Sequence, residues 1–210
     1  MQIDNDILLQ PLKLSIQVSA ISTFFVAITG TIIGYILSRR NFFAKDVIDA
    51  VITLPMVLPP TVTGYYLILV LGRQGLIGQY IYNWTGWTIT FTWQAAVVAS
   101  FVVSLPLMVK TAKAALDSVD IELEKASLLL GKGELETFLK ITLPLAWKGV
   151  LAGVVLSFAR GIGEFGATLM LAGNIPGKTA TMPVAIYSAT QSGDYFLANS
   201  LVVILTILSL

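Results

Sequence analysis

Long apolar stretches separated by short polar segments dominate the pattern of this chain. A membrane-spanning helix needs about 20 mostly apolar residues, and five stretches approach that length. The candidate spans are roughly 12–37, 47–71, 94–109, 149–172 and 196–210. The fifth is still apolar where the sequence stops, so we expect either a further tail or a buried terminus. The pattern predicts an all-α polytopic membrane protein, with residues 1–210 forming a single domain.

Composition supports a bilayer environment and limits the chemistry of the chain. Of its 210 residues, 56% are hydrophobic and 12% are charged, whereas soluble domains usually carry about 25% charged residues. The net charge of +1 argues against a nucleic-acid partner. The sequence has no Cys and no His, which removes thiol nucleophiles, imidazole bases and the usual zinc ligands. We therefore expect a non-catalytic chain that binds no metal or cofactor itself.

Positive charges predict the orientation of the chain, because cytoplasmic loops collect Lys and Arg near the ends of spans. Segments 38–46 and 110–148 together contain nine Lys and Arg, whereas 72–93 and 173–195 contain two. The stretch before the first span is acidic, unlike a cleavable signal, so we expect a retained first helix. The predicted N-terminus is outside the cell membrane, and 38–46 and 110–148 face the cytoplasm.

Two glycine-containing stretches imitate nucleotide-binding motifs. Residues 172–179, AGNIPGKT, differ slightly from the P-loop, and residues 161–166, GIGEFG, fit the dinucleotide fingerprint. The first is predicted outside the cell, follows a membrane helix and contains Pro176, which has no backbone N–H to offer a phosphate. The second lies in an apolar stretch, where glycines allow close packing of helices. Neither predicts a nucleotide site.

Residues 110–148 are too polar to span a membrane and too periodic to be a slack loop. Asp120 is positioned to cap a first amphipathic helix, Gly131 and Gly133 to end it, and Pro144 to end or kink a second. The periodicity alone leaves two interpretations open. The two helices either lie in the lipid interface or fit a groove on a soluble partner.

Two other features mark candidate pathway residues within the spans. Pro55, Pro59 and Pro60 predict a disturbed second span, which is either a static kink or a broken helix beside a pathway or gate. Arg160 and Glu164 lie one turn apart in the fourth span and near mid-membrane by its predicted bounds. They form either a structural ion pair or a polar lining for an anion, and we favour the pathway. The candidate pathway residues are Pro55, Pro59, Pro60, Arg160, Gly161, Glu164 and Gly166.

A spacing within 110–148 resembles the EAA loop of ABC-importer permeases, E-A-A-x3-G-x9-I-x-L-P. Here the residues are Lys125-Ala126-Ser127, Gly131 and Ile141-Thr142-Leu143-Pro144. Lys125 stands in place of the Glu, which is found one residue earlier, and Ser127 replaces the second Ala. The resemblance implies that this loop docks into a separate ATPase subunit. The implied docking residues are Glu124, Lys125, Ala126, Ser127, Gly131, Ile141, Leu143 and Pro144.

Residues 54–78, 118–131 and 158–187 resemble the permeases of molybdate/tungstate ABC transporters. Sulfate permeases share G-E-F-G-A and a following N-x-P loop, and are the close competitor. The resemblance implies a type I importer in which two copies form the pore in the cell membrane. Two cytoplasmic ATPase subunits would bind ATP and Mg, and an extracytoplasmic protein would bind the oxyanion. A secondary anion transporter that uses Arg160 and Glu164 as a charge relay is the less favoured alternative, and a membrane enzyme is disfavoured.

Overall fold

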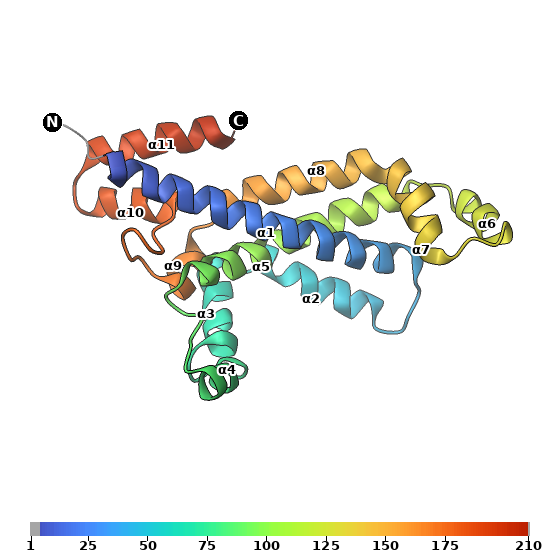
Figure 1. Ribbon diagram of the computed structural model, residues 1–210, viewed down its shortest axis with the longest axis horizontal. Coiled ribbons are helices and arrows are strands. Elements are labelled where there is room, and N and C mark those ends of the chain that lie inside the picture. Colours follow the sequence, from blue (N-terminus) through green and yellow to red (C-terminus); the bar gives the residue numbers. More distant parts are fainter. Residues whose placement is uncertain (1–4, 210) are drawn as a thin grey trace.

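The computed structural model describes residues 5–209, which form helices joined by loops, with no strand among them. Three long helices run along the longest dimension of the molecule, and shorter ones lie at their ends (Figure 1). The elements are α1 (Asn5–Arg39), α2 (Lys45–Val57), α3 (Pro60–Leu71), α4 (Gly78–Thr85), α5 (Trp93–Asp117), α6 (Ile121–Leu129), α7 (Glu134–Thr137), the π-helical turn η1 (Phe138–Thr142), α8 (Leu143–Ile162), α9 (Gly166–Ala172), α10 (Met182–Gln191) and α11 (Tyr195–Ser209).

The centre of the fold is the bundle of α1, α5 and α8, which pack against one another. Small residues bring these helices close together. A Cβ on Gly30 or Gly34 would lie 2.5 Å from Met108 Cγ or 3.1 Å from the Lys113 backbone N. Membrane helices gain little from hydrophobic burial against lipid, so close backbone approach is a main source of their stability. The bundle is thus held by the small-residue packing expected of membrane helices.

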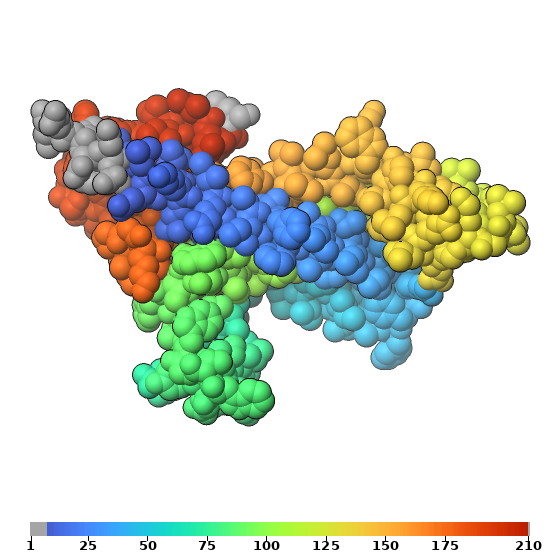
Figure 2. All heavy atoms as spheres, viewed as in Figure 1, coloured from blue at the N-terminus to red at the C-terminus, as the bar shows by residue number. Residues whose placement is uncertain are grey.

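The predicted second span is broken. The chain bends by 118° between α2 and α3, at residues 58–59. Pro59 and Pro60 cause the break, because neither has a backbone N–H for a continuing helix. As a result α3, followed by α4, projects from the body as an arm (Figures 1 and 2). Of the two interpretations of the prolines, a broken helix is the one that the geometry supports.

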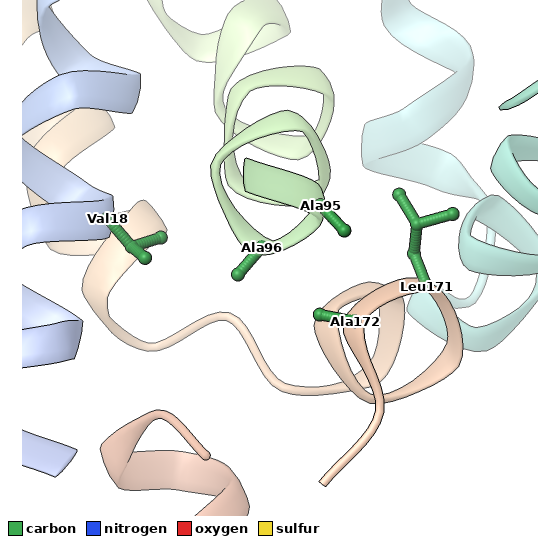
Figure 3. Close-up of a cluster of buried hydrophobic side chains, with 5 residues drawn as sticks. All are labelled: Val18, Ala95, Ala96, Leu171 and Ala172. Carbon is green, nitrogen blue, oxygen red and sulfur yellow. The ribbon is translucent and has the colours of Figure 1, made fainter. Parts of the chain in front are cut away.

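The predicted fourth span is also broken. Helix α8 begins at Leu143, six residues before the predicted start, and ends at Ile162, and a separate helix α9 follows after three residues. Helix α9 packs against the start of α5, where Val18, Ala95, Ala96, Leu171 and Ala172 form a buried cluster (Figure 3). The predicted span 149–172 therefore starts too late and is not continuous, although its predicted end coincides with the end of α9.

The remaining spans agree with the prediction to different degrees. Helices α1 and α5 are long and apolar enough to cross a membrane, as is the stretch from α7 through α8, and the bent pair α2–α3 makes up to four crossings in the described chain. The predicted fifth span is α11, a mostly apolar helix whose 15 residues are fewer than a typical crossing needs. Because α5 continues to Asp117 and α8 begins at Leu143, the segment between these two helices narrows to 118–142.

Candidate functional site

Residues 118–142 form a lobe at one end of the molecule, which we call the α6–α7 lobe (Figure 2). Its first helix starts as the sequence predicts: Asp120 is the N-cap, and its Oδ1 accepts a hydrogen bond of 2.9 Å from the Glu122 N–H. Glu122 and Glu124 lie in the first turn, where acidic side chains interact favourably with the helix dipole. The lobe is therefore two short helices, as predicted.

Gly131 makes the turn that ends α6. Its N–H donates to the Leu128 carbonyl at 3.0 Å, and the Lys132 N–H donates to the Ser127 carbonyl at 3.3 Å. This pair of bonds is a Schellman motif, which places its glycine in the left-handed region, and Gly131 has φ +83°. Gly133 differs, because it has φ −76° and is the N-cap of α7. The first glycine ends one helix and the second begins the next.

Two hydrogen bonds between side chains hold α6 against α7 and η1. The Ser127 and Thr137 hydroxyls lie 2.9 Å apart in a buried contact. The Thr142 hydroxyl donates to Glu124 Oε1, also at 2.9 Å. Ser127, which departs from the EAA pattern, therefore contributes a polar contact within the lobe that an Ala could not make.

Arg39, the last residue of α1, anchors the lobe to the bundle. Its Nη2 lies 2.8 Å from Glu124 Oε1, and its Nε donates to both carboxylate oxygens at 3.0 and 3.1 Å. The same Nη2 donates to the carbonyls of Leu116, in the last turn of α5, and Val119, just beyond that helix. Both charged side chains are only 11% exposed. A single guanidinium thus ties α1, the end of α5 and α6 together.

The predicted docking residues differ in burial. Glu124 and Ser127 are buried and bonded within the chain, whereas Lys125, Ala126, Gly131 and Pro144 are exposed, and the remaining two, Ile141 and Leu143, are half-buried. Lys125 donates to Glu122 Oε1 at 2.7 Å, and this hydrogen bond raises the pKa of Lys125. Large apolar side chains at the tip of α6, Leu129 and Leu130, are 89% and 81% exposed. The lobe therefore has a bonded inner face and an apolar outer tip.

Arg39, Thr137 and Thr142 were not predicted as site residues. Arg39 was used only as evidence of orientation, and Thr142 occupies the variable position between Ile141 and Leu143 of the motif. The signal that could have found Arg39 is its position at the end of a span, because an arginine there can reach a carboxylate in an adjacent loop.

The structure brings the two helix breaks together. Helix α3 packs against α9, and a Cβ on Gly166 would lie 2.8 Å from Pro60 Cβ. One turn along α3, a Cβ on Gly64 would lie 2.9 Å from Ala167 Cα. The predicted pathway residues Pro60 and Gly166 are thus in contact, whereas Pro55 lies inside α2, away from this junction.

Arg160 and Glu164 flank the second break. Arg160 lies in the last turn of α8 rather than at mid-span, because α8 starts earlier and ends sooner than predicted. Its Nη1 lies 2.7 Å from Glu164 Oε2, and the Glu164 side chain is 2% exposed. Glu164 Oε1 accepts a hydrogen bond of 2.8 Å from the Ala167 N–H at the start of α9. The Glu164 carboxylate thus satisfies a backbone N–H in the first turn of α9. The Arg160 side chain is 33% exposed and remains accessible.

Two glycines of the fingerprint-like stretch, Gly161 and Gly166, allow close packing of helices. A Cβ on Gly161 would lie 2.7 Å from Ser100 Oγ, which confirms the close approach of α8 to α5. In the P-loop-like stretch, Thr179 is buried and its hydroxyl accepts from the Ile175 N–H at 3.0 Å. That stretch follows helix α9 instead of a strand. Among residues 5–209 no group of three or more acidic side chains could hold a metal ion.

Comparison with known proteins identifies the family. The family described as binding-protein-dependent transport system inner membrane component matches residues 30–210. The chain belongs to this family. The permease therefore is a multi-pass membrane protein and a transport component rather than an enzyme.

Named relatives and one solved structure agree with this assignment. The permease is 45% identical over 183 residues to the molybdenum transport system permease protein ModB of Escherichia coli, covering 87% of this chain and 80% of ModB. It is 45% identical over 199 residues to the putative molybdenum permease YvgM of Bacillus subtilis, covering 95% and 88%. The inward-facing methionine ABC transporter MetNI matches with a TM-score of 0.73 at 19% identity, over 97% of this chain and 89% of that chain. This last likeness shows the type of fold.

Proposed function

We propose that this chain is the membrane-spanning permease subunit of an ATP-driven importer of molybdate. The observation that carries the proposal is the α6–α7 lobe, an ordered helical projection with an apolar tip in a chain 45% identical to named molybdenum permeases. Polar bonds fix the inner face of α6 to α1, α7 and η1. The lobe is thus held in one position on the bundle, with its apolar tip available to a groove on a partner.

The lobe can transmit movement from a partner to the membrane-spanning helices. Leu129 and Leu130 form an exposed apolar end of α6, a surface that can enter a groove on a partner. Displacement of α6 would be passed to α1 through the Arg39–Glu124 ion pair and to α8 through η1. In this proposal the partner is a cytoplasmic ATPase, which binds ATP and Mg, and this chain performs no hydrolysis.

The pathway in this proposal lies near the two helix breaks, at the interface between two copies of the chain. Backbone groups freed at a helix break in a membrane must be satisfied by protein or by a water-filled cavity. Arg160, one third exposed and beside the junction of α3 and α9, would offer a positive charge to an oxyanion. The N-terminus and the α3–α4 arm would face the extracytoplasmic binding protein, consistent with the distribution of Lys and Arg.

The test is uptake into proteoliposomes that contain the permease and its ATPase, with the cognate binding protein outside. We expect uptake of labelled molybdate that requires ATP and is competed by unlabelled molybdate and tungstate. Uptake that continues without ATP would instead favour a secondary anion transporter. A permease that never binds the ATPase would contradict the proposed role of the lobe.

Sulfate is the second candidate substrate. The probable sulfate transport system permease protein cysT of Chlorella vulgaris is 34% identical over 197 residues, covering 94% of this chain and 74% of cysT. Sulfate and molybdate are both tetrahedral dianions, so charge alone does not separate them. In the same assay, competition by sulfate as strong as that by molybdate would favour the sulfate alternative.

A further inference from the structure

A hollow of about 210 Å³ opens where the end of α1 meets α6 and α7. Charged side chains line it (Arg39, Arg40, Lys125, Glu124 and Glu134), together with the apolar side chains of Ile121 and Leu128. A second groove, of about 260 Å³, runs directly beside it. The hollow and the groove share two residues, Tyr35 and Glu134, so they form one continuous depression with two different ends.

The groove differs from the hollow in having no Lys or Arg in its lining. Besides the two shared residues, its lining is Ile32, Leu135 and Phe138. Leu135 is 71% exposed and Ile32 is 52% exposed, so these apolar side chains are left uncovered by the rest of the chain. A single occupant of both parts would need a polar head and an apolar tail.

The charges of the hollow favour an anionic head. Arg39 and Glu124 neutralise each other in their buried pair, which leaves Arg40 and Lys125, each paired with one exposed carboxylate. The Arg40–Glu134 pair and the pair of Lys125 with Glu122 join side chains that are all more than half exposed. Exposed ion pairs contribute little, so both cations are free to exchange partners. Arginine in particular binds phosphate with two parallel hydrogen bonds.

The depression lies at the end of α1, a helix that can cross a bilayer. Helix α1 is long and apolar enough to span the membrane and ends at Arg39. Tyr35 lies one turn before that end and Ile32 two turns before it, about 10 Å deeper along the helix. In the loop that follows, the Phe43 side chain is fully exposed, as expected for an aromatic anchor in the interface. A membrane boundary near Arg39 would place the hollow at the level of the headgroups and the groove at the level of the acyl chains.

We propose that this depression is a binding site for an anionic phospholipid of the adjacent leaflet. The phosphate pairs with Arg40 and Lys125, and an acyl chain lies along Ile32, Leu135 and Phe138. Such a lipid contacts α1, α6 and α7 at once, so it stabilises the lobe in its present position against the bundle. The proposal does not depend on the substrate of the permease or on the ATPase.

The test measures lipid binding to the purified permease by native mass spectrometry. Dioleoyl phosphatidylglycerol, dioleoyl phosphatidylcholine and glycerol 1-phosphate are titrated separately. We expect phosphatidylglycerol to bind in preference to phosphatidylcholine, and the double variant Arg40→Ala/Lys125→Ala to weaken that binding roughly tenfold. The matched control Lys132→Ala/Lys140→Ala removes two cations from the same lobe outside the depression, and we expect it to bind lipid like the parent.

A third variant tests the groove separately. Leu135→Ser keeps every charge and removes an exposed apolar side chain, and we expect weaker binding of phosphatidylglycerol with an unchanged thermal midpoint of unfolding. Equal binding of phosphatidylcholine, or equal loss in the control double variant, would overturn the proposal. So would displacement of the lipid by glycerol 1-phosphate, which would indicate a site for a free anion. Complete displacement on addition of the ATPase would assign the depression to the partner protein.

Discussion

At the scale of single residues, Glu124 is the most consequential side chain of the lobe. It is buried, and its carboxylate oxygens accept hydrogen bonds from Arg39 and Thr142. A buried carboxylate with such partners forms directional, charge-assisted hydrogen bonds, which fix the relative position of the helices they join. We infer that Glu124 determines where α6 sits on the bundle, and that the exposed residues beside it are available to a partner.

Replacing Glu124 by Gln should destabilise the permease. The change leaves the Arg39 guanidinium buried without its counter-charge, at a cost of about 3 kcal/mol. The matched control is Glu122→Gln, since the side chain of Glu122 is 70% exposed and its pairing with Lys125 contributes little. Thermal unfolding in detergent measures both. Equal midpoints for the two variants would show that the Arg39–Glu124 pair is not structural.

Gly131 gives a second prediction at this scale. Its left-handed φ makes any L side chain strained there, although nothing lies within 4 Å of the position of a Cβ. Gly131→Ala should therefore cost about 1 kcal/mol, whereas Gly133→Ala, at an ordinary φ, should cost much less. Differential unfolding of the two variants is the measurement. The opposite order would exclude the Schellman turn as the reason for the glycine.

The bulkier, charged Gly131→Asp should also uncouple the permease from its ATPase. We expect it to insert in the membrane normally but to lose transport-dependent ATP hydrolysis, because the lobe can no longer keep its turn. Normal stimulation of hydrolysis in this variant would argue against docking through this turn.

At the scale of elements, the contact between α3 and α9 joins the two broken spans. Gly64→Ala would place a Cβ 2.7 Å from Met170 Cβ and 2.9 Å from Ala167 Cα, so the helices would have to separate. Overpacking of this kind costs about 1–3 kcal/mol. We expect lower stability and slower transport. Gly163→Ala is the control, because its nearest new contact is an ordinary 3.7 Å to the Ala159 carbonyl.

The Arg160–Glu164 pair can be tested for a role beyond structure. Arg160→Met leaves Glu164 buried without its counter-charge and should cost about 2 kcal/mol. Adding Glu164→Gln removes that charge and keeps a carbonyl oxygen to accept from the Ala167 N–H, so the double variant should recover stability. We expect the recovered protein still to transport slowly, because the accessible guanidinium is missing. Full recovery of transport would make the pair purely structural.

The sequence predicted the elements of the lobe better than those of the spans. The Asp120 cap and the Gly131 turn follow from local bonding, which short motifs describe well. The break after Ile162 does not follow from a local motif. Gly163 and the hydrogen bond from the Ala167 N–H to Glu164 interrupt an apolar stretch that periodicity predicts as one helix. The Arg39–Glu124 pair joins residues 85 positions apart, and no local pattern contains that information.

At the scale of the whole molecule, the lobe and the α3–α4 arm project from separate parts of the body (Figure 2). The proposed function requires that they face opposite sides of the membrane, with the lobe inside. The excess of Lys and Arg in 38–46 and 110–148 supports this orientation. This orientation also places the proposed lipid site in the cytoplasmic leaflet, because the hollow lies beside the lobe.

The absence of cysteine from the sequence makes this orientation simple to measure. Leu129→Cys places one thiol at the tip of α6, and Trp84→Cys places one on α4, at side chains that are 89% and 90% exposed. In intact spheroplasts that express the permease without partner subunits, a membrane-impermeant maleimide should label only the variant at position 84. Disrupting the membrane should then allow labelling at position 129, and the cysteine-free parent should stay unlabelled throughout. Labelling at position 129 in intact spheroplasts would place the lobe outside, beyond the reach of any cytoplasmic ATPase.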